Sequence, residues 1–148
     1  MKSISALLMV SLVFLISCAH AGQNEKEMYT LASALLHISS SVESAVRYEN
    51  APDSLEDREL VKYATRNDPA LIQPLDGYYI KAKGVMVGQK KHSIILICTS
   101  DKQQALLEDI GCTTALDKNS WKAMAPCEFT LDMSTECMDK CPDLPSLN

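Results

Sequence analysis

The chain has 148 residues and a formal net charge of −5 at pH 7. This length suits a single domain built around one hydrophobic core. The acidic balance argues against a nucleic-acid-binding protein and against a broadly basic membrane-binding surface.

The first 17 residues, MKSISALLMVSLVFLIS, have the pattern of an export signal peptide. Lys2 precedes an apolar run that is too short to span a bilayer comfortably. Two cleavage signals overlap after it: Leu-Ile-Ser-Cys at 15–18 resembles a bacterial lipobox, which would leave a lipid on Cys18, and Ala-His-Ala at 19–21 suits ordinary signal peptidase. We therefore expect a signal peptide at 1–21, or at 1–17 if Cys18 is lipidated, and a single domain at 22–148. The lipobox is favoured in a bacterial host, and only the second site applies in a eukaryotic one.

An amphipathic helix from about Asn24 to Tyr48 is the clearest element. Asn24 and Glu27 have the spacing of a capping box. The apolar positions that follow recur at steps of three and four, which predicts one face laid on the domain core: Met28, Leu31, Leu35, Ile38, Val42 and Ala45. His37 lies outside this stripe and is predicted to be a surface residue.

Two shorter helices and a hairpin follow. Ser54 with Asp57 predicts the start of one helix, and Asp68-Pro69 predicts a short one that Pro74 ends. Residues 77–100 predict a β-hairpin with its turn at 88–91 and a central strand at 94–98, where apolar and β-branched residues run together. Ser100 with Gln103 suggests a further helix that Gly111 ends, and 127–131 suggests a third strand. The predicted fold is α+β: N-terminal helices packed on a small antiparallel sheet, a hairpin plus a third strand, braced by disulfides, with a loose tail at 142–148.

Cysteines predict disulfide bridges, because an exported chain meets an oxidising compartment. Cys18 cannot form a disulfide after either cleavage, because it is removed with the signal peptide or carries the lipid. Five cysteines then remain: Cys98, Cys112, Cys127, Cys137 and Cys141. The expected pairs are Cys98 with Cys112, and Cys127 with Cys137 or Cys141. One thiol is left free or bound to another molecule. The Cys137–Cys141 spacing is a weak metal motif because zinc needs about four ligands and no histidine lies nearby.

Residues typical of catalysis are scarce. The sequence has no G-x-S-x-G turn, no H-E-x-x-H pair, no C-x-x-C and no glycine-rich phosphate loop. His92, beside two lysines, is interpreted as part of a polar turn, and Glu108-Asp109 as a helix surface. We expect no cofactor, no metal and no catalytic residue that the sequence alone identifies.

Candidate contact residues are basic and aromatic. Residues 77–100 carry Lys81, Lys83, Lys90 and Lys91 and no acid, whereas 22–76 and 101–148 each carry a net charge of −5, ten acids against five bases and nine against four. These lysines are either a solvated edge that prevents sheet aggregation or a partner-binding patch. Trp121, the single tryptophan, either anchors a partner or seals the sheet edge.

These observations favour an exported, non-enzymatic protein-binding module: an envelope lipoprotein or a periplasmic accessory, inhibitor or immunity-type protein, or a secreted protein outside bacteria. The expected partner is another protein in the envelope or outside the cell, with no nucleic acid, and with the membrane only through an N-terminal lipid. Two alternatives remain. One is a small exported enzyme, which would need His92 near an acid and an exposed nucleophile, and the other is a thiol-dependent protein that uses its odd cysteine. The sequence leaves the oligomeric state open.

Overall fold

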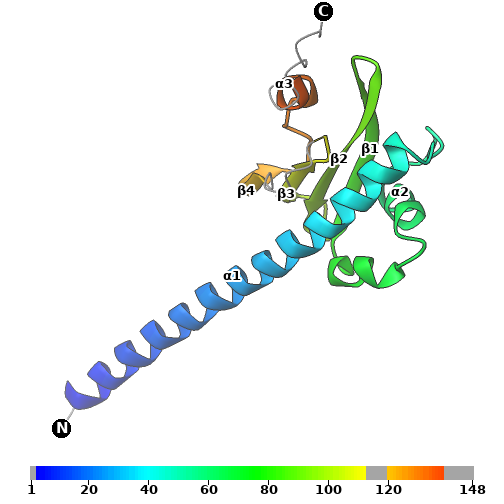
Figure 1. The fold of residues 1–148 in the computed structure, drawn as a ribbon. Coiled ribbons are helices and arrows are strands. Elements are labelled where there is room, and N and C mark those ends of the chain that lie inside the picture. The colour runs from blue at the N-terminus through cyan, green and yellow to red at the C-terminus, as the bar shows by residue number, and fades with distance from the viewer. Residues whose placement is uncertain (1–2, 113–119, 139–148) are drawn as a thin grey trace, which may run out of the picture.

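The computed structural model describes the backbone of residues 3–112 and 120–138, and side chains within those ranges from residue 25 onward. Helices cover one face of a four-stranded antiparallel sheet with strand order β1-β2-β3-β4, as Figure 1 shows. In chain order the elements are α1 (Ser3–Arg47), α2 (Asp57–Ala64), the 3₁₀ helix η1 (Pro69–Leu75), β1 (Tyr79–Val87), β2 (Lys90–Cys98), β3 (Gln104–Ile110), β4 (Ser120–Pro126) and α3 (Met133–Met138). The predicted α+β fold is confirmed, with four strands rather than three.

Helix α1 lays its predicted apolar stripe on the sheet. Leu35, Ile38, Val42 and Ala45 are fully buried in the main core, and α1 contacts β2 and β3. The helix begins at Ser3, however, so the prediction of a helix start at Asn24 is wrong. The preceding residues are rich in Leu, Ala and Ser and can continue a helix without a break. Within the described part of the chain, no helix has the length and hydropathy to cross a membrane.

Helix α2 covers the outer edge of β1. Its Asp57 carboxylate accepts hydrogen bonds from the Ala82 backbone N–H (3.1 Å) and from the Tyr79 hydroxyl (3.3 Å). An edge strand with unpaired N–H groups would otherwise be a template for aggregation. On the inner side of α2, Leu60 and Val61 are buried in the main core. The two short helices begin near the predicted positions.

The predicted hairpin is confirmed. β1 and β2 pair antiparallel from Tyr79↔Cys98 to Val87↔Lys90, and Gly88 turns the chain with φ +61°. Every residue of β2 from His92 to Cys98 is buried, as expected of an interior strand.

The helix predicted after Ser100 is instead strand β3. The chain turns back at 99–103, where Thr99 N–H donates to Gln104 O (2.9 Å) and Lys102 adopts φ +62°. The Asp101 carboxylate accepts from Thr99 Oγ1 and Gln103 N–H, which closes a hairpin turn rather than capping a helix. A strand buried on both faces needs hydrogen-bonding partners on both edges, and this tertiary demand outweighs the local cap pattern.

A second layer covers the other face of the sheet. Residues 127–131 were predicted to be a third strand, but that strand is β4 at 120–126, and the later segment crosses the sheet instead. Phe129 and Leu131 pack there with Ile94 and with Met133 of α3. The sheet therefore lies between α1, α2 and η1 on one side and the C-terminal segment on the other.

Two disulfides hold this second layer, and the predicted pairings are wrong. Cys98 is bonded to Cys127, and Cys112 to Cys137. Cys98 pairs near the first residues of β3 and Cys112 follows its last residue, so they are separated by roughly 20 Å at about 3.4 Å per residue, far beyond the reach of a disulfide. Cys141, the tail at 142–148 and the side chain of Cys18 lie outside the described residues.

Candidate functional site

A buried polar cluster joins α1 to the sheet. The Glu43 carboxylate of α1 lies 2.8 Å from His92 Nδ1, and it accepts hydrogen bonds from the Ser93 N–H (2.8 Å) and the Ser93 hydroxyl (3.1 Å). All three residues are buried. The interpretation of His92 as part of a polar turn is therefore wrong. Its ring is buried on strand β2 and contacts Glu43, an acid 49 residues earlier in the chain.

A second acid lies beside this cluster. Asp109 of β3 is buried, and burial raises the pKa of its carboxyl group. The Ile110 N–H partly offsets this rise, and the charge of Glu43 adds to it. Gly111 follows at the same place, where an added Cβ would lie 2.8 Å from Glu43 Cβ and 2.6 Å from Ser93 Oγ. The backbone therefore approaches α1 too closely for any side chain, and Gly111 does not end a helix as predicted.

The Glu43 cluster has the residue types of a hydrolytic triad but not its geometry. In such a triad the histidine contacts the nucleophilic hydroxyl, whereas Ser93 Oγ donates to Glu43. Ser93 is 0% exposed and His92 is 5% exposed, so a substrate has no access to either. The structure brings His92 to an acid, as the enzyme alternative requires, but without an exposed nucleophile beside it. The cluster fixes α1 on the sheet.

Glu108 forms a second buried centre on the opposite face of β3. Its carboxylate accepts hydrogen bonds from the backbone N–H groups of Thr130 (2.9 Å) and Leu131 (3.1 Å), and the Lys122 ammonium lies 2.7 Å away. Burial opposes ionisation, but these groups outweigh it and lower the pKa of Glu108. Glu108 and Asp109 are therefore buried strand residues, and the prediction that they lie on a helix surface is wrong.

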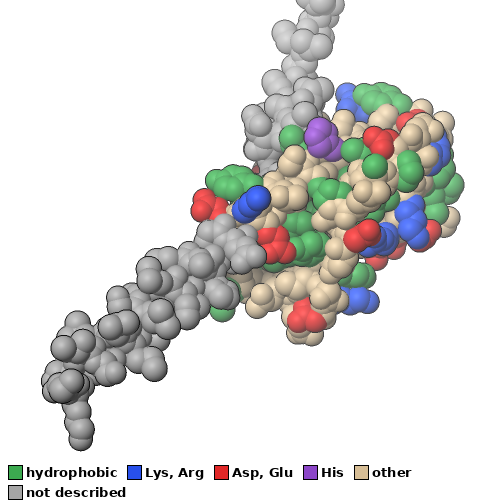
Figure 2. Space-filling view, turned by 90° about the horizontal axis from the view of Figure 1, so that it is seen from below, with side chains coloured by type: hydrophobic (Ala, Val, Ile, Leu, Met, Phe, Trp, Pro, Cys, Tyr) green, Lys and Arg blue, Asp and Glu red, His purple; other side chains and the backbone are tan. Residues whose placement is uncertain are grey.

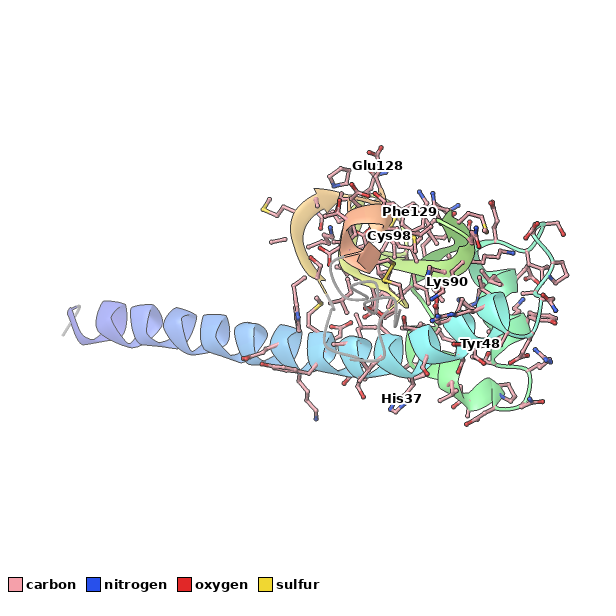
Figure 3. The ribbon with its side chains drawn as sticks, turned by 45° about the horizontal axis from the view of Figure 1, so that its top comes forward. His37, Tyr48, Lys90, Cys98, Glu128 and Phe129 are labelled. Carbon is pink, nitrogen blue, oxygen red and sulfur yellow. A yellow bond between two sulfur atoms is a disulfide. The ribbon has the colours of Figure 1, made fainter. Side chains whose placement is uncertain are left out.

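The four candidate lysines do not form one patch. Lys81 and Lys83 lie over the Phe129 ring, with their ammonium groups 5.1 and 4.7 Å from its centre. Lys91 forms an ion pair with Asp53 and donates to Ala51 O, on the side of the sheet that the helices cover. Lys90 is exposed beside the hairpin turn (Figure 3).

Trp121 lies on β4, the edge strand. It is 49% exposed and meets Tyr29 of α1, which is 62% exposed, edge to face with 5.7 Å between ring centres. Tyr29 also lines a mainly apolar groove between α1 and η1, together with Ala34, Leu71 and Pro74. His37 also lines this groove and is exposed, as predicted, pointing away from the sheet (Figure 3). The two rings thus form an exposed aromatic surface that continues into a groove.

Metal ligands do not gather in the described part of the chain: no group of three or more His, Cys, Asp or Glu side chains there is arranged to hold a metal ion. Charged and apolar side chains are mixed on the helix-covered side, as the view from below in Figure 2 shows. No protein-family model matches the chain, and neither a curated protein nor a solved structure was found to match it.

Proposed function

We propose that this chain is an exported module that binds another protein, and that Tyr29 and Trp121 are the centre of its contact surface. The exposed aromatic pair is the observation that carries the proposal. Trp and Tyr are enriched among the residues that dominate binding energy in protein interfaces. The adjoining apolar groove would accommodate side chains of the partner around this centre.

The N-terminal pattern supports export. An apolar leader followed by two overlapping cleavage signals is typical of an exported chain, and two disulfides are compatible with an oxidising compartment. The intact mass of the protein from its native host tests this directly. A mass beginning at Cys18 with acyl chains identifies a lipoprotein, one beginning at Gly22 identifies a soluble exported protein, and an uncleaved chain would contradict export.

Site-specific photocrosslinking in the native host tests the contact surface. A photoreactive benzoylphenylalanine replaces Trp121 in one variant and Tyr48 in the control. Tyr48 is an equally suitable reporter, because it is aromatic and 69% exposed and lies beyond the far end of α1, about 28 Å from Tyr29 along the helix at 1.5 Å per residue (Figure 3).

The proposal expects a discrete adduct from position 121 that does not form from position 48. Adducts of the same masses from both positions would indicate nonspecific proximity and contradict the assigned surface. The absence of any adduct from position 121 in cells that contain the correctly processed protein would contradict protein binding through this surface.

A further inference from the structure

A cleft separates the β1–β2 hairpin from the C-terminal segment that crosses it. Its volume is about 260 Å³. Apolar side chains from both sides line it, Val85 and Ile94 from the hairpin and Leu131 and Met133 from the segment. Phe129 and Lys83 also line it. None of these residues belongs to the Tyr29–Trp121 surface.

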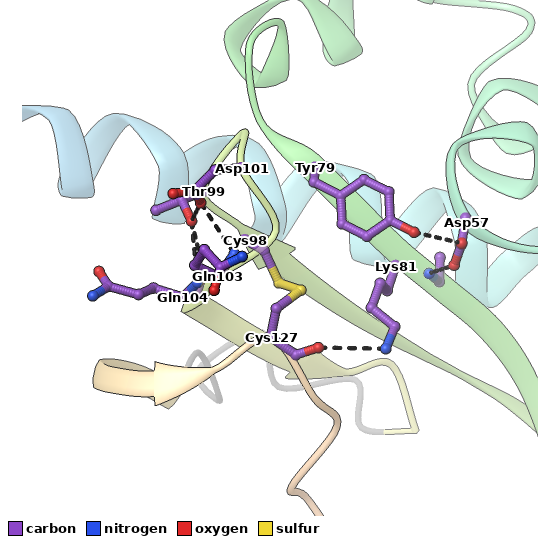
Figure 4. Close-up of a disulfide and its surroundings, with 10 residues drawn as sticks. Asp57, Tyr79, Lys81, Cys98, Thr99, Asp101, Gln103, Gln104 and Cys127 are labelled. Carbon is purple, nitrogen blue, oxygen red and sulfur yellow. Dashed lines mark hydrogen bonds between the residues drawn. A yellow bond between two sulfur atoms is a disulfide. The ribbon is translucent and has the colours of Figure 1, made fainter.

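Two ammonium groups beside Phe129 have no acidic partner in the described part of the chain. Lys81 and Lys83 both lie over the Phe129 ring, and in the described part of the chain neither forms an ion pair. Lys81 donates only to the carbonyl oxygen of Cys127 (3.4 Å), as Figure 4 shows. Three other lysines, Lys62, Lys91 and Lys122, each pair with a carboxylate.

The framework around these lysines is rigid. The Cys98–Cys127 disulfide fixes the segment two residues before Phe129 to β2 (Figure 4). Thr130 and Leu131, directly after Phe129, donate their N–H groups to the buried Glu108 carboxylate. The ring and both ammonium groups are thus held in place before any partner arrives, which lowers the entropic cost of binding.

An acid is also among the residues that line the cleft. Hydrogen bonds from Ser134 and Thr135 lower the pKa of the Asp132 carboxyl group. An anionic group is therefore attracted to the ammonium groups of Lys81 and Lys83 and repelled by the Asp132 carboxylate. Glu128 is exposed and points outward from the same segment (Figure 3), where it does not pair with either lysine.

We propose that this cleft is a second binding site, which takes an acidic peptide segment of a protein partner and buries one of its apolar side chains. The carboxylates would lie on Lys81 and Lys83, and the apolar side chain would fill the space between Ile94 and Leu131. The volume of about 260 Å³ is below the about 300–1,000 Å³ of pockets for drug-sized ligands, so the cleft would take one side chain of a partner rather than a whole small molecule. The site is made of different residues from the Tyr29–Trp121 surface and does not depend on it.

Fluorescence anisotropy of a labelled peptide tests the proposal on the oxidised, processed protein. The probe is Glu-Asp-Leu-Phe-Asp-Glu, and the matched probe is Lys-Lys-Leu-Phe-Lys-Lys. The test variant is Lys81→Gln/Lys83→Gln, and the control is Lys26→Gln/Lys62→Gln, which removes the same charge from α1 and α2, on the helix-covered side of the sheet.

The acidic probe should bind saturably, and the test variant should weaken it by about tenfold, the combined effect of two partly exposed ion pairs. The control variant should change its affinity less than twofold, and the basic probe should not bind. Equal loss in both variants would reduce the effect to net charge and overturn the site. So would the absence of saturable binding.

Amide chemical-shift mapping supplies a readout that does not depend on the variants. The acidic probe should shift the signals of Lys83, Val85 and Leu131 and leave Tyr29 and Trp121 unchanged. Shifts confined to Tyr29 and Trp121 would overturn this site while supporting the proposed function. Palmitate serves as a second probe, because it combines a carboxylate with an apolar chain but is not a peptide. If palmitate shifts the signals of Lys83, Val85 and Leu131 and the acidic peptide does not, the peptide assignment is overturned.

Discussion

Glu108 and Asp109 are neighbours on β3, yet their carboxyl groups lie on opposite faces of the sheet and their pKa values are shifted in opposite directions. Glu108 is ionised against Lys122, Thr130 and Leu131 in the C-terminal layer, which lowers its pKa. Asp109 is buried towards α1 near the charge of Glu43, which raises its pKa. The two acids therefore make opposite contributions to the pH dependence of stability.

Replacing Asp109 by Asn should not destabilise the protein at pH 7. Because the pKa of Asp109 is raised in the folded state, its stabilising contribution is complete below the unfolded value and is lost as the pH rises through the folded one. Above the folded pKa the buried carboxyl group is charged, which costs stability. Asp109→Asn removes this cost, so the variant should be at least as stable as the wild type at pH 7 and should lose any advantage in stability near pH 4. Urea unfolding at both pH values measures the difference. A variant that is clearly less stable at pH 7 would show that the charged form of Asp109 stabilises the fold.

Replacing Glu108 by Gln should have the opposite pH dependence. The lowered pKa means that its contribution is present above the unfolded value and disappears as the pH falls through the folded one. At pH 7, Glu108→Gln leaves the Lys122 ammonium buried without its counter-charge and should cost about 3 kcal/mol. In unfolding experiments the deficit should shrink towards pH 3. A deficit that does not change with pH would assign the loss to packing.

Truncating Glu43 should be among the most damaging changes on α1. Glu43→Ala leaves the N–H and hydroxyl of Ser93 and the His92 ring without their acceptor, at a cost of about 3 kcal/mol. Glu49→Ala is the matched control, because Glu49 forms an exposed ion pair with Arg66 that is worth at most about 1 kcal/mol. Chemical denaturation at pH 7 compares the two variants. Similar losses would mean that the buried cluster contributes no more than a surface pair.

Peptide mapping of the unreduced protein tests the disulfide pairs. Digestion with trypsin and a glutamate-specific protease separates all four bridged cysteines and should yield linked peptides for Cys98–Cys127 and Cys112–Cys137. Alkylation should label Cys141 in the processed chain. A linked Cys98–Cys112 peptide would contradict the fold, because β3 lies between these residues.

Each bridge should also stabilise the fold. The sequence separations are 29 and 25 residues, and loops of this size correspond to about 3.5 kcal/mol each in the chain-entropy model. Cys98→Ala/Cys127→Ala and Cys112→Ala/Cys137→Ala should therefore each unfold at lower denaturant concentration than the wild type. A double variant with an unchanged midpoint would mean that its bridge constrains little.

Local sequence patterns predicted correctly those elements whose apolar residues alone identify the buried face. The apolar stripe from Leu31 to Ala45 and the buried run from Ile94 to Cys98 each predict their element and its buried face. The Ser100–Gln103 cap pattern failed because the same residues also form a hairpin turn, and the choice depends on the need of β2 for a second partner. The predicted Cys98–Cys112 pair was wrong for the same reason. A helix could bring Cys112 back to Cys98, whereas the extended strand β3 places Cys112 far from it.

The buried centres could not be predicted from local sequence. Glu43 reaches His92 and Ser93 only because α1 crosses the sheet, and Glu108 reaches Thr130 only because the C-terminal segment crosses the other face. One sequence signal was present for the Glu108 centre and for Asp109: these two adjacent acids stand in a segment whose other residues, Leu106, Leu107 and Ile110, are apolar. The Tyr29–Trp121 contact joins residues far apart in the chain, so the sequence could nominate Trp121 but not its neighbour.

The affinity of the partner captured at position 121 for purified wild-type and Trp121→Ala proteins tests the central claim most directly. A central aromatic contact typically contributes at least about 2 kcal/mol, so the variant should bind at least tenfold more weakly. Its melting temperature should change little because half of the side chain is already exposed. Tyr48→Ala should bind like the wild type. Equal affinities of wild-type and Trp121→Ala proteins would contradict the assignment of this surface as the protein-binding site.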